Sequence, residues 1–198
     1  ARLFEGLCLL RLGEYQRAIA LFDPLISQLP DQVDVAQAAF YLGESYSGLG
    51  RHAEAIPAYE RALDASDRPP WGPLAQFGLG WAQYRLGRWE PAVVSFERYL
   101  KRKVREHRTE ALFAQGSCLV QLGREQEALG RFDEIVTQSP DHALACESAL
   151  ALSDAHRRQE SFSRAREVLH ALLRPGLTAH CRAQINMRLG TIALAEGN

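Results

Sequence analysis

A leucine-glycine pair recurs along the chain at a nearly constant interval. The pairs are Leu12-Gly13, Leu49-Gly50, Leu86-Gly87 and Leu122-Gly123, and Glu160 and Gly197 continue the same register. Successive members lie 37, 37, 36, 37 and 37 residues apart. Self-similarity at such a period indicates a repeat architecture in which each unit is one supersecondary element, so the chain is not an ordinary single-core domain.

The same small and large residues surround each pair. Seven residues before each member lies a small residue: Gly6, Gly43, Gly80, Gly116, Ser153 and Gly190. Five residues after each of the first five members lies an alanine, and four further on lies a large side chain: Phe22, Tyr59, Phe96, Phe132 and Leu169. Apolar residues at three- and four-residue spacing on both sides of the pair predict two amphipathic helices per unit. The glycine of the pair ends the first helix, and the small residues let the two helices approach closely while the large side chain fills the adjoining space.

Composition favours helices and excludes several other classes. Ala and Leu contribute 28 residues each, whereas Val, Ile and Thr together contribute 18, a balance that favours helix over sheet. A net charge of -1 with 46% hydrophobic residues excludes intrinsic disorder, and no run of 18 apolar residues marks a membrane span. The charge is unevenly distributed, with -4 over residues 1–97 and +3 over residues 98–198.

The second unit carries the fullest version of the pattern, with Leu42, Gly43, Tyr46, Leu49, Gly50, Ala55, Tyr59 and Ala62. This order resembles the tetratricopeptide repeat, whose usual period is 34 residues. The resemblance implies an all-α, right-handed α-solenoid in which first helices line the concave side. Two features depart from the family pattern: the period is longer by two or three residues, and the fifth unit has Ser153 and Glu160 in place of glycines.

The register divides the chain into five full repeats and part of a sixth, which we expect to form one continuous solenoid. The approximate bounds are 1–32, 33–69, 70–106, 107–142, 143–179 and 180–198. Second helices are predicted to end near Pro30, Pro69-Pro70, Pro140 and Pro175. Neither end resembles a polar capping element, so we expect the sequence to be part of a longer array.

The longer period, together with the segment Phe40-Tyr41-Leu42-Gly43 in an Ala-rich helix, is similar to tetratricopeptide proteins of the bacterial cell envelope. Examples are the outer-membrane assembly lipoprotein and the TolA-binding coordinator protein. This resemblance implies a periplasmic or envelope location, and the cytoplasm is the alternative.

Stacked hairpins offer an extended surface, which suits a peptide or protein segment more than a small-molecule substrate. Candidate partner-binding residues lie on first-helix positions that share one face: Phe40, Glu44, Phe77, Trp81, Tyr84, Arg85, Phe113, Asp154 and Arg157. Trp81 is distinctive because repeats two, four, five and six hold Glu44, Ser117, Asp154 and Thr191 at the equivalent position. The alternative interpretations are that the apolar row containing Phe40 and Phe77 packs between units, and that Trp81 covers a local gap. A clamp for a terminal carboxylate, which some relatives build from Lys and Asn, is not expected from these residues.

A basic cluster of Arg98, Lys101, Arg102, Lys103, Arg105 and Arg108 spans the end of the third unit and its junction with the fourth. It is a solvated surface or a site for an acidic segment or anionic lipid. Nucleic acid is not expected as a partner because only Tyr99 could stack on a base within this stretch.

The sequence contains none of the motifs of phosphate binding, serine hydrolysis or zinc proteolysis, so we expect neither catalysis nor a cofactor. Cys8 and Cys118 occupy equivalent places three units apart, too far for an intramolecular disulfide. Cys146 and Cys181 lie near the starts of adjacent first helices, with His142 and His180 nearby, but without the short spacings of a zinc site. The function expected is a non-catalytic binding scaffold; the alternative is a regulatory or self-assembling domain attached to a catalytic or DNA-binding domain.

Overall fold

The computed structural model describes residues 2–29, 31–102 and 104–197, and within these ranges the only regular structure is α-helix. The chain divides into two compact units, Ala1–Glu106 and His107–Asn198. The prediction of an all-α solenoid of stacked hairpins is confirmed. Within the same described ranges, no helix is long and apolar enough to span a bilayer.

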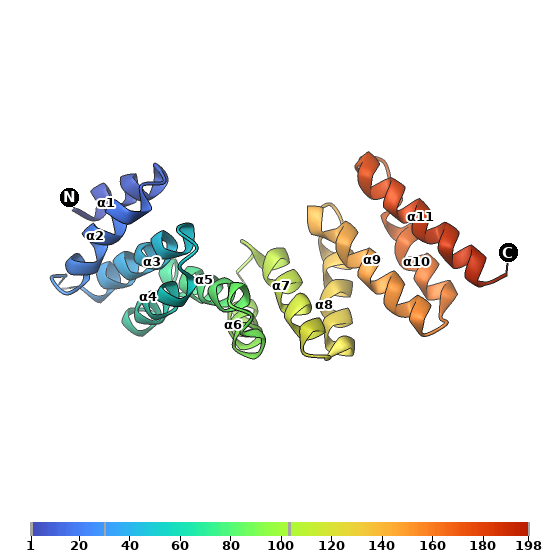
Figure 1. The fold of residues 1–198 in the computed structure, drawn as a ribbon, viewed down its shortest axis with the longest axis horizontal. Helices are drawn as coiled ribbons and strands as arrows, with labels where there is room; N and C mark the ends of the chain where they lie inside the picture. Colours follow the sequence, from blue (N-terminus) through green and yellow to red (C-terminus); the bar gives the residue numbers. More distant parts are fainter. Residues whose placement is uncertain (1, 30, 103, 198) are drawn as a thin grey trace. The chain divides into compact units, whose positions relative to one another are not determined.

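The first unit contains three helical hairpins (Figure 1). They are α1 (Arg2–Arg11) with α2 (Tyr15–Ile26), α3 (Gln32–Gly48) with α4 (His52–Ala65), and α5 (Trp71–Arg85) with α6 (Trp89–Lys101). The N-terminus of α3 is capped by the Asp31 side chain, which accepts a hydrogen bond from the Val33 backbone N–H. One aliphatic and aromatic core runs through the first two hairpins and into α5.

The second unit contains two hairpins and one further helix. They are α7 (Arg108–Gln121) with α8 (Glu125–Gln138), α9 (Ala143–Arg158) with α10 (Phe162–Leu172), and α11 (Ala179–Ala195). The second helices α4, α8 and α10 end two to four residues before Pro69, Pro140 and Pro175, as predicted. Pro30 lies outside the described residues.

Each turn between the helices of a hairpin has the same backbone geometry. The glycine of the pair takes a left-handed conformation, with φ of 76° at Gly13 and 72° at Gly50. The next residue donates its N–H to a carbonyl five positions back, as Glu14 does to Leu9 and Arg51 to Tyr46. These are the bonds of a Schellman motif, which satisfies carbonyls left unpaired at the helix end.

The fifth turn keeps this geometry without glycine. Glu160 has φ of 56°, and the Ser161 N–H donates to the His156 carbonyl, five residues back, as in the other turns. A non-glycine residue in this region carries a steric penalty from its Cβ. The register therefore identified the turn correctly even though the signature residue is lost.

A second set of glycines is required by close packing. A Cβ at Gly43 would lie 2.6 Å from the Tyr59 ring, and the same relation joins Gly6 to Phe22. A Cβ at Gly80 would lie 2.8 Å from the Phe96 ring, and a Cβ at Gly116 would lie 2.7 Å from the Phe132 ring. The four rings are 0 to 4% exposed, so the predicted packing of the large side chain against the small residue is confirmed. In the fifth hairpin, Ser153 and Leu169 replace the pair, and both are buried.

Replacing Gly43 by Ala is expected to destabilise the first unit by about 1–3 kcal/mol, because the added methyl group would overlap the buried Tyr59 ring. The matched control is Gly130→Ala in α8, where nothing lies within 4 Å of an added Cβ. That change should stabilise by up to about 1 kcal/mol, since Ala has the higher helix propensity. Denaturant unfolding of the two variants measures both effects, and an equal shift in the same direction would contradict the packing role of Gly43.

Replacing Glu160 by Gly should stabilise the second unit by about 1 kcal/mol, because glycine adopts positive φ without the steric cost. The control is Gly123→Ala, which places a Cβ at φ of 72° with nothing within 4 Å. It should destabilise by a similar amount. Thermal unfolding that is unchanged by both substitutions would show that the turns relax to accommodate a side chain.

Candidate functional site

The strongest concentration of aromatic side chains lies on the α5–α6 hairpin. The Trp81 ring contacts Phe77, Tyr84 and Phe96, with centroid distances of 6.1, 5.3 and 5.9 Å. Tyr84 in turn contacts Trp89 at 5.5 Å. The contacts with Trp81 and Trp89 are edge-to-face, the geometry that the ring quadrupoles favour. We call Phe77, Trp81 and Tyr84 the aromatic cluster.

The aromatic cluster is more exposed than the rings beneath it. Phe96 and Tyr99 are 0 and 1% exposed, whereas all three members of the cluster are half-buried. Trp81 and Tyr84 therefore have rings fixed by neighbours on one side and accessible on the other. Large, rigid rings held in this way contribute contact area with little loss of side-chain entropy on binding.

Two further predicted residues of the first unit lie on α3. Phe40 is 9% exposed and its ring contacts Tyr41, Tyr59 and Trp71, so it belongs to the core between α3, α4 and α5. Glu44 is half-buried, and its Oε1 accepts a hydrogen bond of 2.5 Å from the Tyr59 hydroxyl. The burial of Phe40 agrees with the alternative that its row packs between units. Arg85, at the end of α5, is exposed.

Tyr59 occupies a constrained position beneath Glu44. Its ring contacts the backbone of α3 at Gly43 and of α5 at Gly78, and its hydroxyl also lies 3.1 Å from the Ser47 Oγ. Burial, followed by the nearby charge of Glu44, raises the pKa of Tyr59 well above its ordinary value. The hydroxyl therefore stays protonated at neutral pH and donates to the carboxylate.

The predicted residues of the second unit have partners within that unit. The Phe113 ring contacts Phe132 at 5.8 Å. Asp154 forms ion pairs with Arg188 at 2.8 Å and with Arg157 at 3.8 Å. The carboxylate of Asp154 and the guanidinium of Arg157 are thus already engaged with each other.

The basic cluster is partly neutralised by neighbouring acids. Lys101 pairs with Glu97 at 2.7 Å, and Arg102 binds both the carbonyl and the carboxylate of Asp67. Arg108, in the second unit, pairs with Glu134 at 2.6 Å. Arg98 and Arg105 are exposed, and Lys103 lies outside the described residues. These pairs account for part of the local charge, which weakens the cluster as an anion site.

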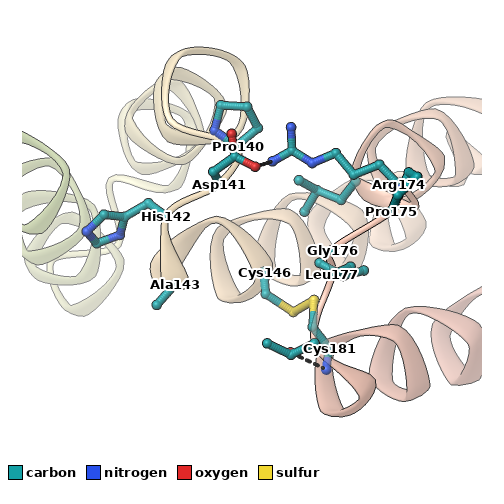
Figure 2. A pocket seen from close by; sticks show the side chains of 12 residues that line it. Pro140, Asp141, His142, Ala143, Cys146, Arg174, Pro175, Gly176, Leu177 and Cys181 are labelled. Atoms are coloured by element: carbon teal, nitrogen blue, oxygen red, sulfur yellow. Dashed lines mark hydrogen bonds and ion pairs between the residues drawn. A yellow bond between two sulfur atoms is a disulfide. The ribbon is translucent and has the colours of Figure 1, made fainter.

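A disulfide that the sequence reasoning missed joins Cys146 at the start of α9 to Cys181 at the start of α11 (Figure 2). The disulfide lines a pocket of about 140 Å³. Arg174 and Asp141 also line this pocket and form an ion pair of 2.8 Å. His142 points away from the disulfide, with its Nε2 3.8 Å from Glu110 of α7. No group of three or more His, Cys, Asp or Glu residues in the described parts of the chain is placed to hold a metal.

The two remaining cysteines differ in environment. Cys8 is exposed on α1, and Cys118 is buried. Burial raises the pKa of the Cys118 thiol to about 12, so this thiol stays protonated and unreactive at neutral pH. As small residues of first helices, both cysteines are expected from the sequence to be buried; this is confirmed for Cys118 and wrong for Cys8.

The sequence signature of the tetratricopeptide repeat matches residues 2–68 in one form and residues 40–103 and 77–143 in another. The chain belongs to the tetratricopeptide repeat family. No curated protein matches it. Among solved structures it is similar to YrrB, described as a TPR protein with an unusual peptide-binding site, at 22% identity and a TM-score of 0.70, covering all of this chain and 91% of YrrB.

Two further tetratricopeptide structures show the same fold. MamA is 15% identical with a TM-score of 0.70, over 85% of this chain and 92% of MamA. The ligand-free form of RapI is 18% identical with a TM-score of 0.69, over 86% of this chain and 67% of RapI. Proteins of this family are in general protein-interaction modules, so the tetratricopeptide chain described here is a protein-binding scaffold in the same coarse sense.

Reduction of the disulfide is expected to loosen α11, which buries only Cys181, Ile185 and Ile192. Closing a loop over a sequence separation of 35 residues contributes about 2–4 kcal/mol. Amide hydrogen exchange in α11 should accelerate on reduction, and to the same extent in the variant carrying both Cys146→Ser and Cys181→Ser. The control is Cys8→Ser, which should leave α11 unchanged; exchange that is insensitive to reductant would contradict a stabilising role.

Proposed function

We propose that this tetratricopeptide chain is a non-catalytic scaffold that binds a peptide or an extended protein segment along the concave face formed by its first helices. The observation that carries the proposal is the aromatic cluster on α5. Its three rings lie about one helical turn apart on one helix. Phe77 packs against Phe96 and Tyr99 of α6, and Trp81 packs against Phe96. Trp81 stands where the other first helices carry Leu7, Glu44, Ser117, Asp154 and Thr191, so the fold itself does not demand an aromatic residue there.

The chemistry of this face suits a segment that brings apolar side chains to the rings. Trp and Tyr are the residues that most often dominate binding energies at protein interfaces. The structural neighbour YrrB, described as having a peptide-binding site, makes a peptide a reasonable first probe. Phe77 supports the rings from within the hairpin, and Arg85 would contact the partner at the end of α5.

We also propose an oxidising compartment such as the bacterial envelope as the place where this scaffold works. The support is the disulfide between Cys146 and Cys181, because disulfides persist in oxidising compartments and are rare in the cytosol. An envelope assembly would use the solenoid to hold an extended segment of another protein.

Selection from a displayed library of random dodecapeptides, followed by fluorescence polarisation of the selected peptides, tests the binding face. Trp81→Ala should weaken binding about 30-fold, the loss expected for a truncated hot-spot residue. The matched control is Val120→Ala, which removes an apolar side chain 49% exposed at the position of α7 equivalent to Tyr84. Binding that falls equally in both variants, or in neither, would rule out the aromatic cluster as the site.

A further inference from the structure

Glu44 on α3 is a half-buried carboxylate. Its Oε1 accepts a hydrogen bond of 2.5 Å from the Tyr59 hydroxyl, and the Ser47 Oγ lies 3.1 Å from the same hydroxyl. Within residues 2–29, 31–102 and 104–197, no Lys, Arg or His forms an ion pair with it. Partly desolvated charges are normally paired, because removing a charge from water is costly.

The fifth repeat shows how the same fold neutralises a carboxylate at this position. Asp154 is the equivalent of Glu44, since each directly follows the small residue, Ser153 or Gly43, that lies seven positions before the turn residue of its unit. Asp154 is paired with Arg188 of the next first helix at 2.8 Å and with Arg157 of its own helix at 3.8 Å. The fold therefore has room for cations on two sides of this carboxylate.

Neither of these cations has a counterpart beside Glu44. The position equivalent to Arg188 is Gly78, and the position equivalent to Arg157 is Ser47. Glycine at position 78 is required by packing, because a Cβ there would lie 2.6 Å from the Tyr59 ring and 3.0 Å from its hydroxyl oxygen. The hydroxyl thus takes up part of the space that a cation fills in the fifth repeat, and it supplies one hydrogen bond but no charge.

The same contacts place the carboxylate beside the aromatic cluster. The Tyr59 hydroxyl that holds Glu44 lies against α5 at Gly78. Trp81 is three residues further along α5, so it lies on the same side of that helix as Gly78. An acidic acceptor on α3 and a half-exposed indole on α5 therefore border one stretch of the surface.

We propose that Glu44 binds a basic side chain, lysine or arginine, of the bound peptide while Trp81 and Tyr84 contact its aliphatic stem or an adjacent apolar residue. This inference rests on the proposed peptide-binding function and specifies the chemistry of the partner. A charged group donating to a carboxylate forms a stronger hydrogen bond than a neutral one, and a cation near an indole face is attracted by the ring quadrupole. The net charge of -4 over residues 1–97 favours the approach of a basic segment. Tyr59 acts as a positioning residue because it orients the carboxylate.

The first test compares peptides selected by the wild-type chain with those selected by Glu44→Gln, using the same displayed dodecapeptide library. Wild-type binders should share a Lys or Arg next to apolar residues, and Glu44→Gln should lose that preference. For a selected peptide, Glu44→Gln should weaken binding at least about tenfold, and replacing the basic residue of the peptide by Ala should then have little further effect. Glu60→Gln, an exposed position on the second helix α4, is the matched control and should leave the affinity unchanged, because it removes a carboxylate away from the first-helix face.

A second variant tests the inference without altering Glu44. Ser47→Arg introduces a cation at the position that Arg157 occupies beside Asp154. The new guanidinium should pair with the Glu44 carboxylate and so weaken the binding of the same peptides. Tyr59→Phe keeps the ring against Gly43 and Gly78 but removes the hydroxyl, and it should weaken binding by a few-fold. Circular dichroism confirms that each variant remains folded at the assay temperature.

The outcomes separate this inference from the proposed function. Wild-type binders without a shared basic residue, or binding unaffected by both Glu44→Gln and Ser47→Arg, would overturn the role of Glu44, and continued sensitivity to Trp81→Ala would then leave the peptide-binding face in place. A wild-type chain that selects no peptide would overturn both.

Discussion

The contact between a glycine of one helix and the aromatic ring of the next is the constraint on which this structure depends. Because a Cβ at Gly6, Gly43, Gly80 or Gly116 would overlap the facing ring, the two helices of each hairpin can approach only where the side chain is absent. That approach buries the ring and fixes which faces of the first helix point toward its partner. The remaining face of the first helix is then left for contacts of other kinds, and its residues vary from repeat to repeat.

Because one face of each first helix is fixed by packing and the other is not, repeats with the same fold can carry different surface residues. At the position that follows the early small residue, the second, third and fifth repeats carry Glu44, Trp81 and Asp154. Their surroundings differ accordingly: Tyr59 holds Glu44, Phe77 and Phe96 support Trp81, and Arg188 pairs with Asp154. In a solenoid each repeat contacts mainly its neighbours, so such local substitutions can be made without disturbing the rest of the fold.

Much of the fold follows from the sequence because its determinants are local and periodic. The turn glycines, the packing glycines and the aromatic residues opposite them recur at one interval, and the register located even the turn at Glu160. Trp81 was recognisable as a candidate because it breaks the pattern of its row. The disulfide was not predicted, since the pairing of Cys146 with Cys181 depends on the distance between the first helices of two adjacent repeats, which the repeat pattern does not specify. The burial of Phe40 and the internal pairing of Asp154 likewise depend on side-chain contacts between repeats, which periodicity alone does not specify.

The disulfide also changes how the second unit would respond to mechanical force. A chain pulled from its ends transmits tension through covalent bonds, and the bond between Cys146 and Cys181 bypasses the intervening segment, with a sequence separation of 35 residues. At full extension that segment would add about 120 Å of contour length. While the bond is intact, α10 and most of α9 carry no load, so this part of the solenoid would keep its helices while unbridged repeats elsewhere are drawn out.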